Sequence, residues 1–329
     1  MEIWKIVLIA LCSAAVLLFL VFILFAAVVD KVAFGKRADK NPLLKYFTAD
    51  DFGLDCEPVC INDGKTVLRG CIYRKQAQSG KLVIFCHGMG PGHSAYTTEI
   101  NYFCNSGYTV LAIDYRGCNM SDGKNIGGMY SGVRGVKAAI DFARADERLK
   151  EFEIYLVGHS WGGYSALCAS CERKVNGVVA MGAPDTPSKT IAAGAAHVVS
   201  EPFGCIIRPF LYIIYALRYG RRGNLSAAKC ADKNGVPTLL IHGDSDKIVP
   251  VCNEAISKAK GKNVTKYIAA GKGHNPYNTV EAQTLLDALT AKLLQVKSEA
   301  DKEYFKTFDF AAATQEDAQI MKLISDFIG

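Results

Sequence analysis

The sequence predicts an α/β fold: a mostly parallel sheet flanked by helices, with a helical cap insertion and an N-terminal transmembrane helix in front of it. Three observations predict this. Short apolar runs rich in β-branched residues alternate with longer amphipathic stretches, one segment interrupts that alternation, and the chain begins with a long uncharged apolar run. Buried parallel strands read as nearly continuous apolar runs, because crossover helices cover both faces of their sheet.

The composition excludes several classes of protein. Of the 329 residues, 50% are hydrophobic and 21% are charged, so the chain can form a large core and is not disordered. Its net charge of +6 is scattered along the sequence, which argues against a nucleic-acid partner. Twelve cysteines are too few for a small disulfide-based scaffold.

Residues 6–29 form a run of 24 residues without a formal charge, which predicts a transmembrane helix. At 1.5 Å per residue such a helix is about 36 Å long, enough to cross a hydrocarbon core of about 30 Å. A cleaved signal peptide is the alternative, since Ala26 and Ala27 are small enough for cleavage. The apolar run is nevertheless longer than the about 7–15 residues usual in a signal peptide.

The charges on either side of this span predict its orientation. Only Lys5 precedes it, whereas five basic residues follow it closely: Lys31, Lys36, Arg37, Lys40 and Lys45. Basic residues favour the cytoplasmic side, so the large domain is expected there, with an extracytoplasmic domain as the alternative. Eleven cysteines lie outside the span, and this odd number agrees with free thiols in a reducing compartment.

Strands and helices alternate through the rest of the chain. Strands are expected at residues 67–73, 81–86, 108–114, 153–157, 177–181, 237–242 and 264–269. Helices are expected at residues 94–106, 128–145, 161–172, 251–260, 280–297 and 315–328. The role of the last helix stays open, because it can dock either on the domain or on a partner.

The segment at about residues 184–235 has no strand signal and is longer than an ordinary connection. It is expected to form a helical cap over the carboxyl edge of the sheet, in which Pro209 suits the first turn of a helix and Gly220 its end. The apolar side chains between them would line an acyl pocket or touch the bilayer, with Arg218, Arg221 and Arg222 near lipid phosphates. The alternative is a lid helix packed on the sheet with its charged end in water.

The strongest chemical signal is the G-x-S-x-G pattern formed by Gly158, Ser160 and Gly162. It lies between an expected strand and an expected helix, as a nucleophile elbow requires. Side chains two residues to either side would collide on this sharp turn, so both positions favour glycine. The turn also places Ser160 at a helix N-terminus, where partial positive charge favours a developing anion.

A serine nucleophile needs a histidine base and an acid that orients the base. Asp246 follows the strand expected at 237–242, and His274 follows the strand expected at 264–269. The order serine, acid, histidine is the one expected for an elbow of this kind. Asp244, two residues earlier, is the alternative acid.

The oxyanion hole is expected from two backbone N–H groups. One belongs to Trp161, the residue after the nucleophile, and the other is assigned to Met89 in the glycine-rich loop 87–90. Each such donor contributes about 3–4 kcal/mol to the transition state.

Together these motifs resemble the α/β-hydrolase superfamily over roughly residues 56–329. The stretch 114–121 is similar to the loop after the fourth strand in serine-aminopeptidase-like and monoacylglycerol-lipase-like members, except that Asn119 replaces a frequent glycine. Asparagine tolerates positive φ better than most residues, so the turn can survive. The residue pattern predicts a span at 6–29, a juxtamembrane linker at 30–55 and a cap at about 184–235, and the resemblance implies a hydrolase domain at 56–329. The whole resembles membrane-anchored serine hydrolases of that group.

The other cysteines and histidines have simpler explanations. Cys168 and Cys171 form a C-x-x-C inside an expected helix, where small buried side chains are a better explanation than a redox or zinc site. Of the remaining histidines, His87 and His159 are expected to be structural, His242 to end a strand and His197 to lie in the cap facing solvent, whereas lining the pocket is left open as an alternative for His93.

The expected function is that of a membrane-anchored serine hydrolase that needs neither a metal nor an organic cofactor. An apolar cap and a membrane anchor favour a small-molecule ester or thioester with a lipid-like acyl group. A serine aminopeptidase-type peptidase is one alternative, with an amine-binding acid in the cap: Asp185, Glu201 or Asp232. Another is a binding or lipid-carrier protein without turnover. The sequence does not predict an oligomeric state.

Overall fold

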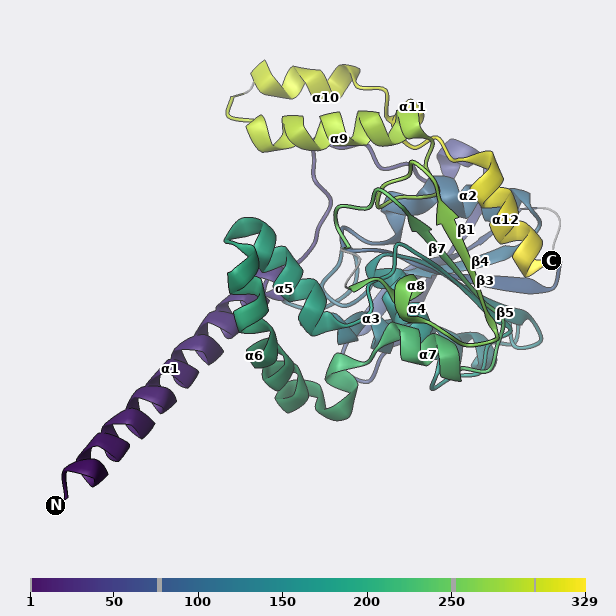
Figure 1. Cartoon of the computed structure of the whole chain (residues 1–329). Helices are drawn as coiled ribbons and strands as arrows, with labels where there is room; N and C mark the ends of the chain where they lie inside the picture. The colour runs from purple at the N-terminus through teal and green to yellow at the C-terminus, as the bar shows by residue number, and fades with distance from the viewer. Residues whose placement is uncertain (1, 76–78, 250–252, 299) are drawn as a thin grey trace.

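The computed structural model describes residues 2–75, 79–249, 253–298 and 300–329 (Figure 1). Its centre is an eight-stranded sheet of order β1-β2-β4-β3-β5-β6-β7-β8, in which β1 and β2 are antiparallel to their neighbours and the pairs from β4 to β8 are parallel. The strands are β1 (Asp55–Asn62), β2 (Val67–Arg74), β3 (Lys81–Cys86), β4 (Thr109–Ile113), β5 (Glu153–His159), β6 (Gly177–Met181), β7 (Thr238–Gly243) and β8 (Val264–Ala269).

All seven expected strands are present to within two residues at either end, and the sequence pattern misses only β1. This outer strand has no continuous apolar run, because only Val59 and Ile61 are buried. Pro58 interrupts it further, as is tolerated at the edge of a sheet. The order and directions of the other strands bring the ends of β5, β7 and β8 to one edge.

Helices cover both faces of the sheet and form two cores. Leu82 and Ile84 of β3 belong to one core, and Val83 and Phe85 to the other. The first core is shared with α3 (Tyr130–Ala145), α4 (Trp161–Ser170), α7 (Ala227–Lys233) and α8 (Ala255–Lys258), and the second with α2 (Thr97–Asn105) and α12 (Ala318–Ile328). α8 is the helix expected at 251–260 and is shorter than predicted. Residues 251 and 252 lie outside the described residues.

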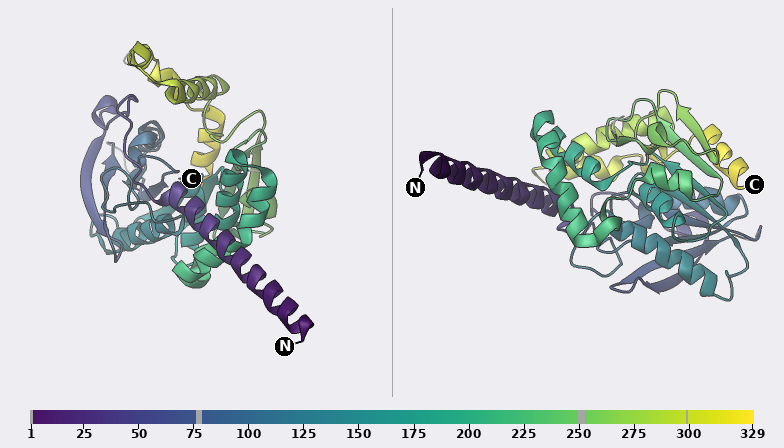
Figure 2. Two further views of the ribbon diagram at one scale, coloured as in Figure 1. Left: turned by 90° about the vertical axis from the view of Figure 1, so that its left-hand side faces the viewer. Right: turned by 60° about the horizontal axis from the view of Figure 1, so that its bottom comes forward.

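A single long helix, α1 (Ile3–Phe34), projects from the rest of the chain in both views of Figure 2. It continues five residues beyond the predicted end of the span at 29, so the predicted linker 30–55 begins as helix. The helix is long and apolar enough to cross a membrane, features that an N-terminal signal sequence shares.

The segment after α1 is attached to the domain that contains the sheet rather than free. Ala38 pairs with Cys118 in a short parallel bridge, and the N–H of Ala38 donates to the carbonyl of Gly117 at 2.9 Å. The guanidinium of Arg37 donates to three carbonyls of the loop after β4, those of Asn119, Ser121 and Gly123. These contacts fix the direction of α1 relative to the sheet.

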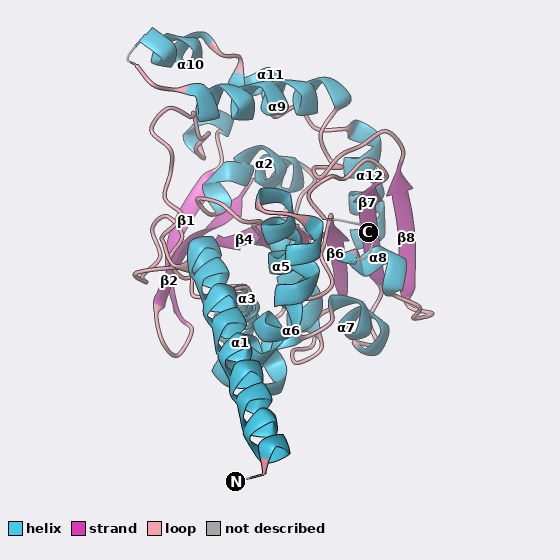
Figure 3. Ribbon diagram, turned by 60° about the vertical axis from the view of Figure 1, so that its left-hand side comes forward, coloured by secondary structure: helices cyan, strands magenta, loops and turns pink. Residues whose placement is uncertain are grey.

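The cap consists of α5 (Pro187–Val198), α6 (Glu201–Tyr219) and the 3₁₀ turn η3 (Gly220–Asn224), and α6 lies beside α1 (Figure 3). The prediction that Pro209 begins the cap helix is wrong, because α6 begins eight residues earlier. Gly204 allows this part of α6 to approach α5, since a Cβ there would lie 2.6 Å from the carbonyl oxygen of Ala192. Gly220 ends α6 with φ +62°, as expected.

The last part of the expected cap range 184–235 belongs to the body of the domain. α7 packs on α4, and Ala227 and Ala231 are fully buried there. Its short alanine-rich sequence carries no strand signal, which is why the pattern assigned it to the cap. The cap itself ends near Asn224.

The C-terminal segment answers the question left open for the last helix. Its apolar side chains Ile320, Met321, Ile324 and Ile328 are buried against the sheet, so α12 docks on the domain. Before it, α9 (Val280–Gln295), η5 (Ala300–Lys302), α10 (Glu303–Thr307) and α11 (Phe310–Ala313) form a separate group at one side of the molecule (Figure 1).

Candidate active site

Ser160 occupies a strained turn between β5 and α4. Its φ of +54° and ψ of −119° are rare for a residue with a side chain. A Cβ on Gly158 would lie 2.6 Å from the backbone of Gly162, and one on Gly162 would lie 1.8 Å from the carbonyl oxygen of Cys86. Glycine is required at both positions by this close approach. The Ser160 N–H donates to Met181 of β6 at 2.7 Å and holds the turn in place.

The structure brings Ser160, His274 and Asp246 into one hydrogen-bonded series. Nε2 of His274 lies 2.8 Å from Oγ of Ser160, and Nδ1 of His274 lies 2.8 Å from Oδ2 of Asp246. A neutral imidazole in this position donates from Nδ1 to the carboxylate and accepts the serine proton at Nε2. The three residues follow β5, β8 and β7, whose carboxyl ends meet at one edge of the sheet.

Asp246 is held as a buried carboxylate by several donors. The N–H groups of Ile248 and Val249 donate to Oδ1 at 2.8 and 3.0 Å, and Nε2 of His242 lies 3.1 Å from Oδ2. Burial opposes ionisation, but the close approach of His242 and the hydrogen bond from His274 outweigh it and hold the pKa of Asp246 well below its usual range. Sequence reasoning treated His242 only as the end of a strand. Its spacing of four residues before the acid is the signal that could have placed it here.

The alternative acid, Asp244, has a different role. It is exposed, and its carboxylate accepts hydrogen bonds from the N–H of Gly271 and the hydroxyl of Ser245. These contacts join the loops after β7 and β8. Of the two acids considered, it is therefore Asp246 that contacts His274.

The two residues expected to form the oxyanion hole lie at the start of α4 and in the loop after β3. Trp161 is the first residue of α4, and its indole Nε1 donates to the carbonyl of Met129 at 2.7 Å. Met89 lies in the loop after β3. In the described part of the chain, no backbone carbonyl accepts a hydrogen bond from the N–H of Met89 or of Trp161. The first N–H groups of a helix have no partner within it, so that of Trp161 is available to an anion.

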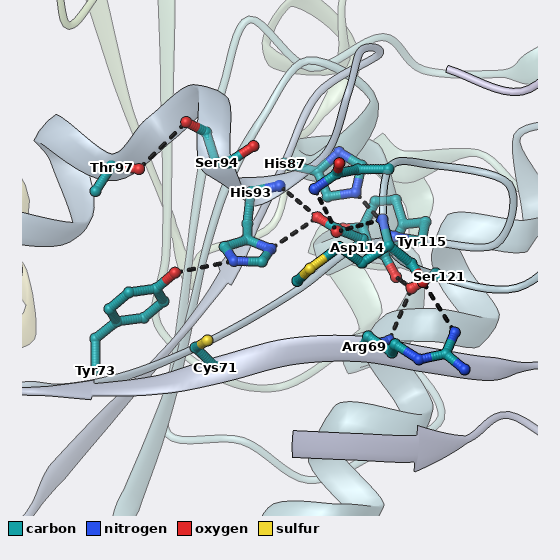
Figure 4. Close-up of polar contacts among 12 residues, drawn as sticks. Arg69, Cys71, Tyr73, His87, His93, Ser94, Thr97, Asp114, Tyr115 and Ser121 are labelled. Carbon is teal, nitrogen blue, oxygen red and sulfur yellow. Dashed lines mark hydrogen bonds and ion pairs between the residues drawn. The ribbon is translucent and has the colours of Figure 1, made fainter. Parts of the chain in front are cut away.

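A second aspartate–histidine pair supports the loop that carries Met89 (Figure 4). Oδ1 of Asp114 accepts from Nδ1 of His93 at 2.7 Å and from its backbone N–H at 2.9 Å. Nε2 of His93 then accepts from the hydroxyl of Tyr73 at 2.9 Å. The alternative left open for His93, that it lines a pocket, is not supported, because its side chain is only 3% exposed and both ring nitrogens are used within this network.

Two further contacts complete the support of this loop. The N–H of Tyr115 donates to Nε2 of His87 at 3.0 Å, so Nδ1 carries the proton and donates to the carbonyl of Gly88 at 2.7 Å. Burial lowers the pKa of His87 to about 4, which keeps the ring neutral at pH 7. Asn119 has the expected positive φ, +39°, and its amide donates to Oδ2 of Asp114 at 3.0 Å.

His159 connects the loop after β3, which carries Gly88 and Met89, with the backbone of His274. Its Nε2 lies 3.0 Å from the carbonyl of His274, which can only accept, so Nε2 carries the proton. Nδ1 then accepts from the hydroxyl of Tyr96 at 2.9 Å, and Tyr96 in turn accepts from the N–H of Gly88 at 3.0 Å. Burial lowers the pKa of His159 to about 3 and keeps this tautomer neutral.

The cysteines of the C-x-x-C lie beside a third thiol. Cys168 is buried inside α4, and Cys171 at its end donates to the carbonyl of Cys230 at 3.3 Å. Hydrogen bonding within this cluster, followed by burial, raises the pKa of the Cys171 thiol and keeps it protonated. Within the described ranges, no group of three or more His, Cys, Asp or Glu side chains is placed to hold a metal.

The sequence is similar to that of known hydrolases over part of its length. Residues 77–203 match a family described as serine aminopeptidase, S33. A 2-hydroxy-6-oxononadienedioate/2-hydroxy-6-oxononatrienedioate hydrolase of Paraburkholderia phymatum is 30% identical over 132 residues, 38% of this chain and 43% of that protein. A multifunctional-autoprocessing repeats-in-toxin protein of Vibrio vulnificus is 26% identical over 257 residues, 76% of this chain but 4% of the toxin. The chain thus spans less than half the length of either relative.

The fold agrees with this similarity. An esterase of Pyrococcus furiosus superposes with a TM-score of 0.58 and 22% identity, covering 79% of this chain and 97% of the esterase. Another crystal form of that esterase gives a TM-score of 0.57 at 20% identity, covering 82% and 99%. This chain therefore has the α/β-hydrolase fold, as the resemblance of its motifs implies.

Proposed function

We propose that this α/β hydrolase is a membrane-anchored serine hydrolase that cleaves a carboxylic ester or thioester through an acyl-enzyme. The observation that carries the proposal is the hydrogen-bonded series from Asp246 through His274 to Ser160, with the serine on a strained turn. α1 supplies the membrane anchor, and the basic residues that follow the span favour a cytoplasmic hydrolase domain.

In this proposal each residue carries out one step. Oγ of Ser160 attacks the carbonyl carbon while Nε2 of His274 takes its proton, and the imidazolium then returns a proton to the leaving group. Asp246 stays ionised, because its pKa is depressed, and stabilises the imidazolium without accepting its proton. The N–H groups of Met89 and Trp161 hold the oxyanion, and water then cleaves the acyl-enzyme by the same base.

The cap favours an apolar substrate. Five large apolar side chains share one face of α6, because they recur every three or four residues: Phe203, Ile206, Phe210, Ile213 and Leu217. Ring contacts join this face to the apolar run of α1: Phe210 stacks on Phe22 with centroids 5.3 Å apart, and Phe203 lies 6.1 Å from Phe25. Leu217, at the end of the same face, is 83% exposed. Because this face contacts the apolar run of α1, it would lie at the same depth in the membrane. This position supports a substrate with a lipid-like acyl group.

The peptidase alternative has less support from the acids of the cap region. Asp185 is buried and already paired with Nζ of Lys258 at 3.0 Å. Asp232 accepts from the N–H groups of Lys260 and Gly261. Only Glu201, exposed at the start of α6, is left of the three candidates for a substrate ammonium.

A covalent probe separates the hydrolase from a protein that only binds its ligand. The full chain in detergent is incubated with a fluorophosphonate, beside Ser160→Ala and, as a matched control, Ser170→Ala on the same helix α4. Labelling of the wild type and the control but not of Ser160→Ala is the expected result. A folded wild type that is not labelled contradicts the proposal and favours a binding protein.

Rates on a series of p-nitrophenyl esters, from acetate to palmitate, then test the substrate class. The exposed apolar face of α6 predicts a maximum at medium or long acyl chains. A preference for acetate, together with faster cleavage of aminoacyl amides than of esters, would favour the peptidase instead.

A further inference from the structure

A cavity of about 520 Å³ lies where α1 meets the hydrolase domain. Its wall comes from the end of α1, the turn between β1 and β2, the loop after β4 with the start of α3, and the end of α6. The lining side chains include five cations, Lys31, Lys65, Arg116, Arg134 and Arg218, and one carboxylate, Asp30. The 13 lining residues thus carry a net charge of +4, whereas all 329 residues together carry +6, and this local concentration of positive charge favours an anion.

The structure neutralises only part of this charge. Arg218 pairs with Asp30 at 2.8 Å, and Arg134 pairs with Asp63 at 2.7 Å. Over the described ranges, no carboxylate lies within ion-pair distance of the other three cations, Lys31, Lys65 and Arg116. Nε of Arg116 is also shielded from solvent without a hydrogen-bond partner. A cation without an ion-pair partner among like charges is unfavourable, and an anion in the cavity beside the guanidinium would offset its charge.

The position of the cavity identifies the source of that anion. Its wall includes Ala27, which lies inside the apolar run 6–29, and Lys31, which comes just after that run. Asp30 accepts from the hydroxyl of Tyr215 at 3.0 Å, so α1 and α6 are joined at this level. The cavity therefore opens at the boundary between acyl chains and headgroups, where basic side chains attract anionic lipids.

We propose that this cavity binds the phosphate headgroup of an anionic phospholipid from the leaflet next to the hydrolase domain. The proposal rests on α1 crossing a membrane, and it does not depend on the chemistry of Ser160. The planar guanidinium of Arg116 presents paired donors that match two phosphate oxygens. Lys31 and Lys65 add charge from the two sides of the cavity, and the apolar surface of α1 accommodates the acyl chains.

Spin-labelled lipids test this proposal in the full chain reconstituted in phosphatidylcholine vesicles. Electron spin resonance gives the fraction of labelled phosphatidylglycerol or phosphatidylcholine that is held at the protein. Phosphatidylglycerol is expected to associate roughly fivefold more strongly. Lys31→Gln with Arg116→Gln should bring the ratio close to one. Lys262→Gln with Lys266→Gln, a matched loss of two exposed charges near β8, should leave it unchanged. Lys31→Gln with Lys65→Gln serves if Arg116 proves necessary for folding.

The proposal is overturned if the two lipids associate equally with the protein. It is also overturned if the preference for phosphatidylglycerol persists in the cavity variants. Displacement of the labelled lipid by inorganic phosphate, but not by sulfate at equal ionic strength, would identify a soluble phosphate as the ligand. Alkaline carbonate extraction is run alongside. Release of the chain overturns the anchor and this proposal together, whereas a retained chain that fluorophosphonate does not label overturns only the hydrolase.

Discussion

Two buried aspartate–histidine pairs in this chain have nearly the same geometry, but the histidine of each contacts a different hydroxyl group. Nδ1 of His274 lies 2.8 Å from Asp246, and Nδ1 of His93 lies 2.7 Å from Asp114. The first series ends at the hydroxyl of Ser160 and the second at that of Tyr73. The side chain of His274 is 15% exposed, whereas that of His93 is 3% exposed.

The difference shows what an aspartate–histidine pair needs in order to act as a base. Both carboxyl groups have lowered pKa values, because hydrogen bonds and charge from histidine outweigh the effect of burial. Electrostatics therefore does not distinguish the two pairs. The distinction lies in the third residue: Ser160 sits on a strained turn and is half-buried, whereas Tyr73 is buried within a strand of the core.

Replacing the histidine of each pair should give the largest contrast. His274→Ala removes the base, and turnover should fall by about 10⁶-fold while the thermal midpoint changes little. His93→Ala leaves the buried Asp114 carboxylate without its main partner and should cost roughly 3 kcal/mol of stability. Ester hydrolysis and thermal unfolding of both variants measure this. A His93→Ala protein as inactive as His274→Ala but fully stable would contradict the distinction.

Replacing the aspartates should separate orientation from stability. Asp246→Asn should lower kcat by about 10⁴-fold, because an amide no longer holds the tautomer that has a free Nε2. Asp114→Asn should act on acid stability. Its lowered pKa stabilises the fold above about pH 4, and this contribution is lost as the pH falls through the folded-state pKa.

The measurement for this second pair is urea unfolding of wild type and Asp114→Asn between pH 7 and 3. The variant should be less stable at pH 7 and should lose less stability than the wild type below about pH 4. Parallel unfolding curves over the whole range would mean that Asp114 does not titrate with folding.

Sequence reasoning locates the candidate active site better than the cap, and the reason is physical. Ser160, Asp246 and His274 are marked by short local patterns, since each follows a buried strand and the glycines around the serine answer a local steric need. The strands themselves are marked by continuous apolar runs. Contacts between segments far apart in the chain leave no such trace, as with the His93–Asp114–Tyr73 network.

The cap shows where local rules mislead. Pro209 suggests the start of a helix, yet α6 runs through it, because its packing on α1 and α5 compensates for the missing backbone hydrogen bond. Lys31, Lys65 and Arg116 likewise appear scattered in the sequence. Only the docking of α1 brings them to one cavity.

Tyr96→Phe, with a smaller expected effect, tests the link between the loop after β3 and the loop after β8 that carries His274. The hydroxyl of Tyr96 accepts from the N–H of Gly88 and donates to His159, which holds the backbone of His274. Loss of this hydroxyl should loosen His274 relative to the loop after β3 that carries Met89. We therefore expect kcat to fall roughly tenfold with KM nearly unchanged. His159→Gln, which keeps a donor to the carbonyl of His274, should lose less than His159→Ala. Equal losses in both would point to packing alone.

The smallest effect is expected for Tyr73→Phe, which removes one hydroxyl, as Ser160→Ala does. His93 loses its Nε2 partner but keeps both hydrogen bonds to Asp114, so the cost should be about 1 kcal/mol of stability. Fluorophosphonate labelling and kcat should stay at the wild-type level, whereas Ser160→Ala abolishes both and leaves the thermal midpoint nearly unchanged. Two deletions of one hydroxyl then have opposite consequences, because one ends a series that faces substrate and the other ends a series enclosed by the core. A Tyr73→Phe variant with normal stability and reduced labelling would mean that the second pair takes part in the chemistry.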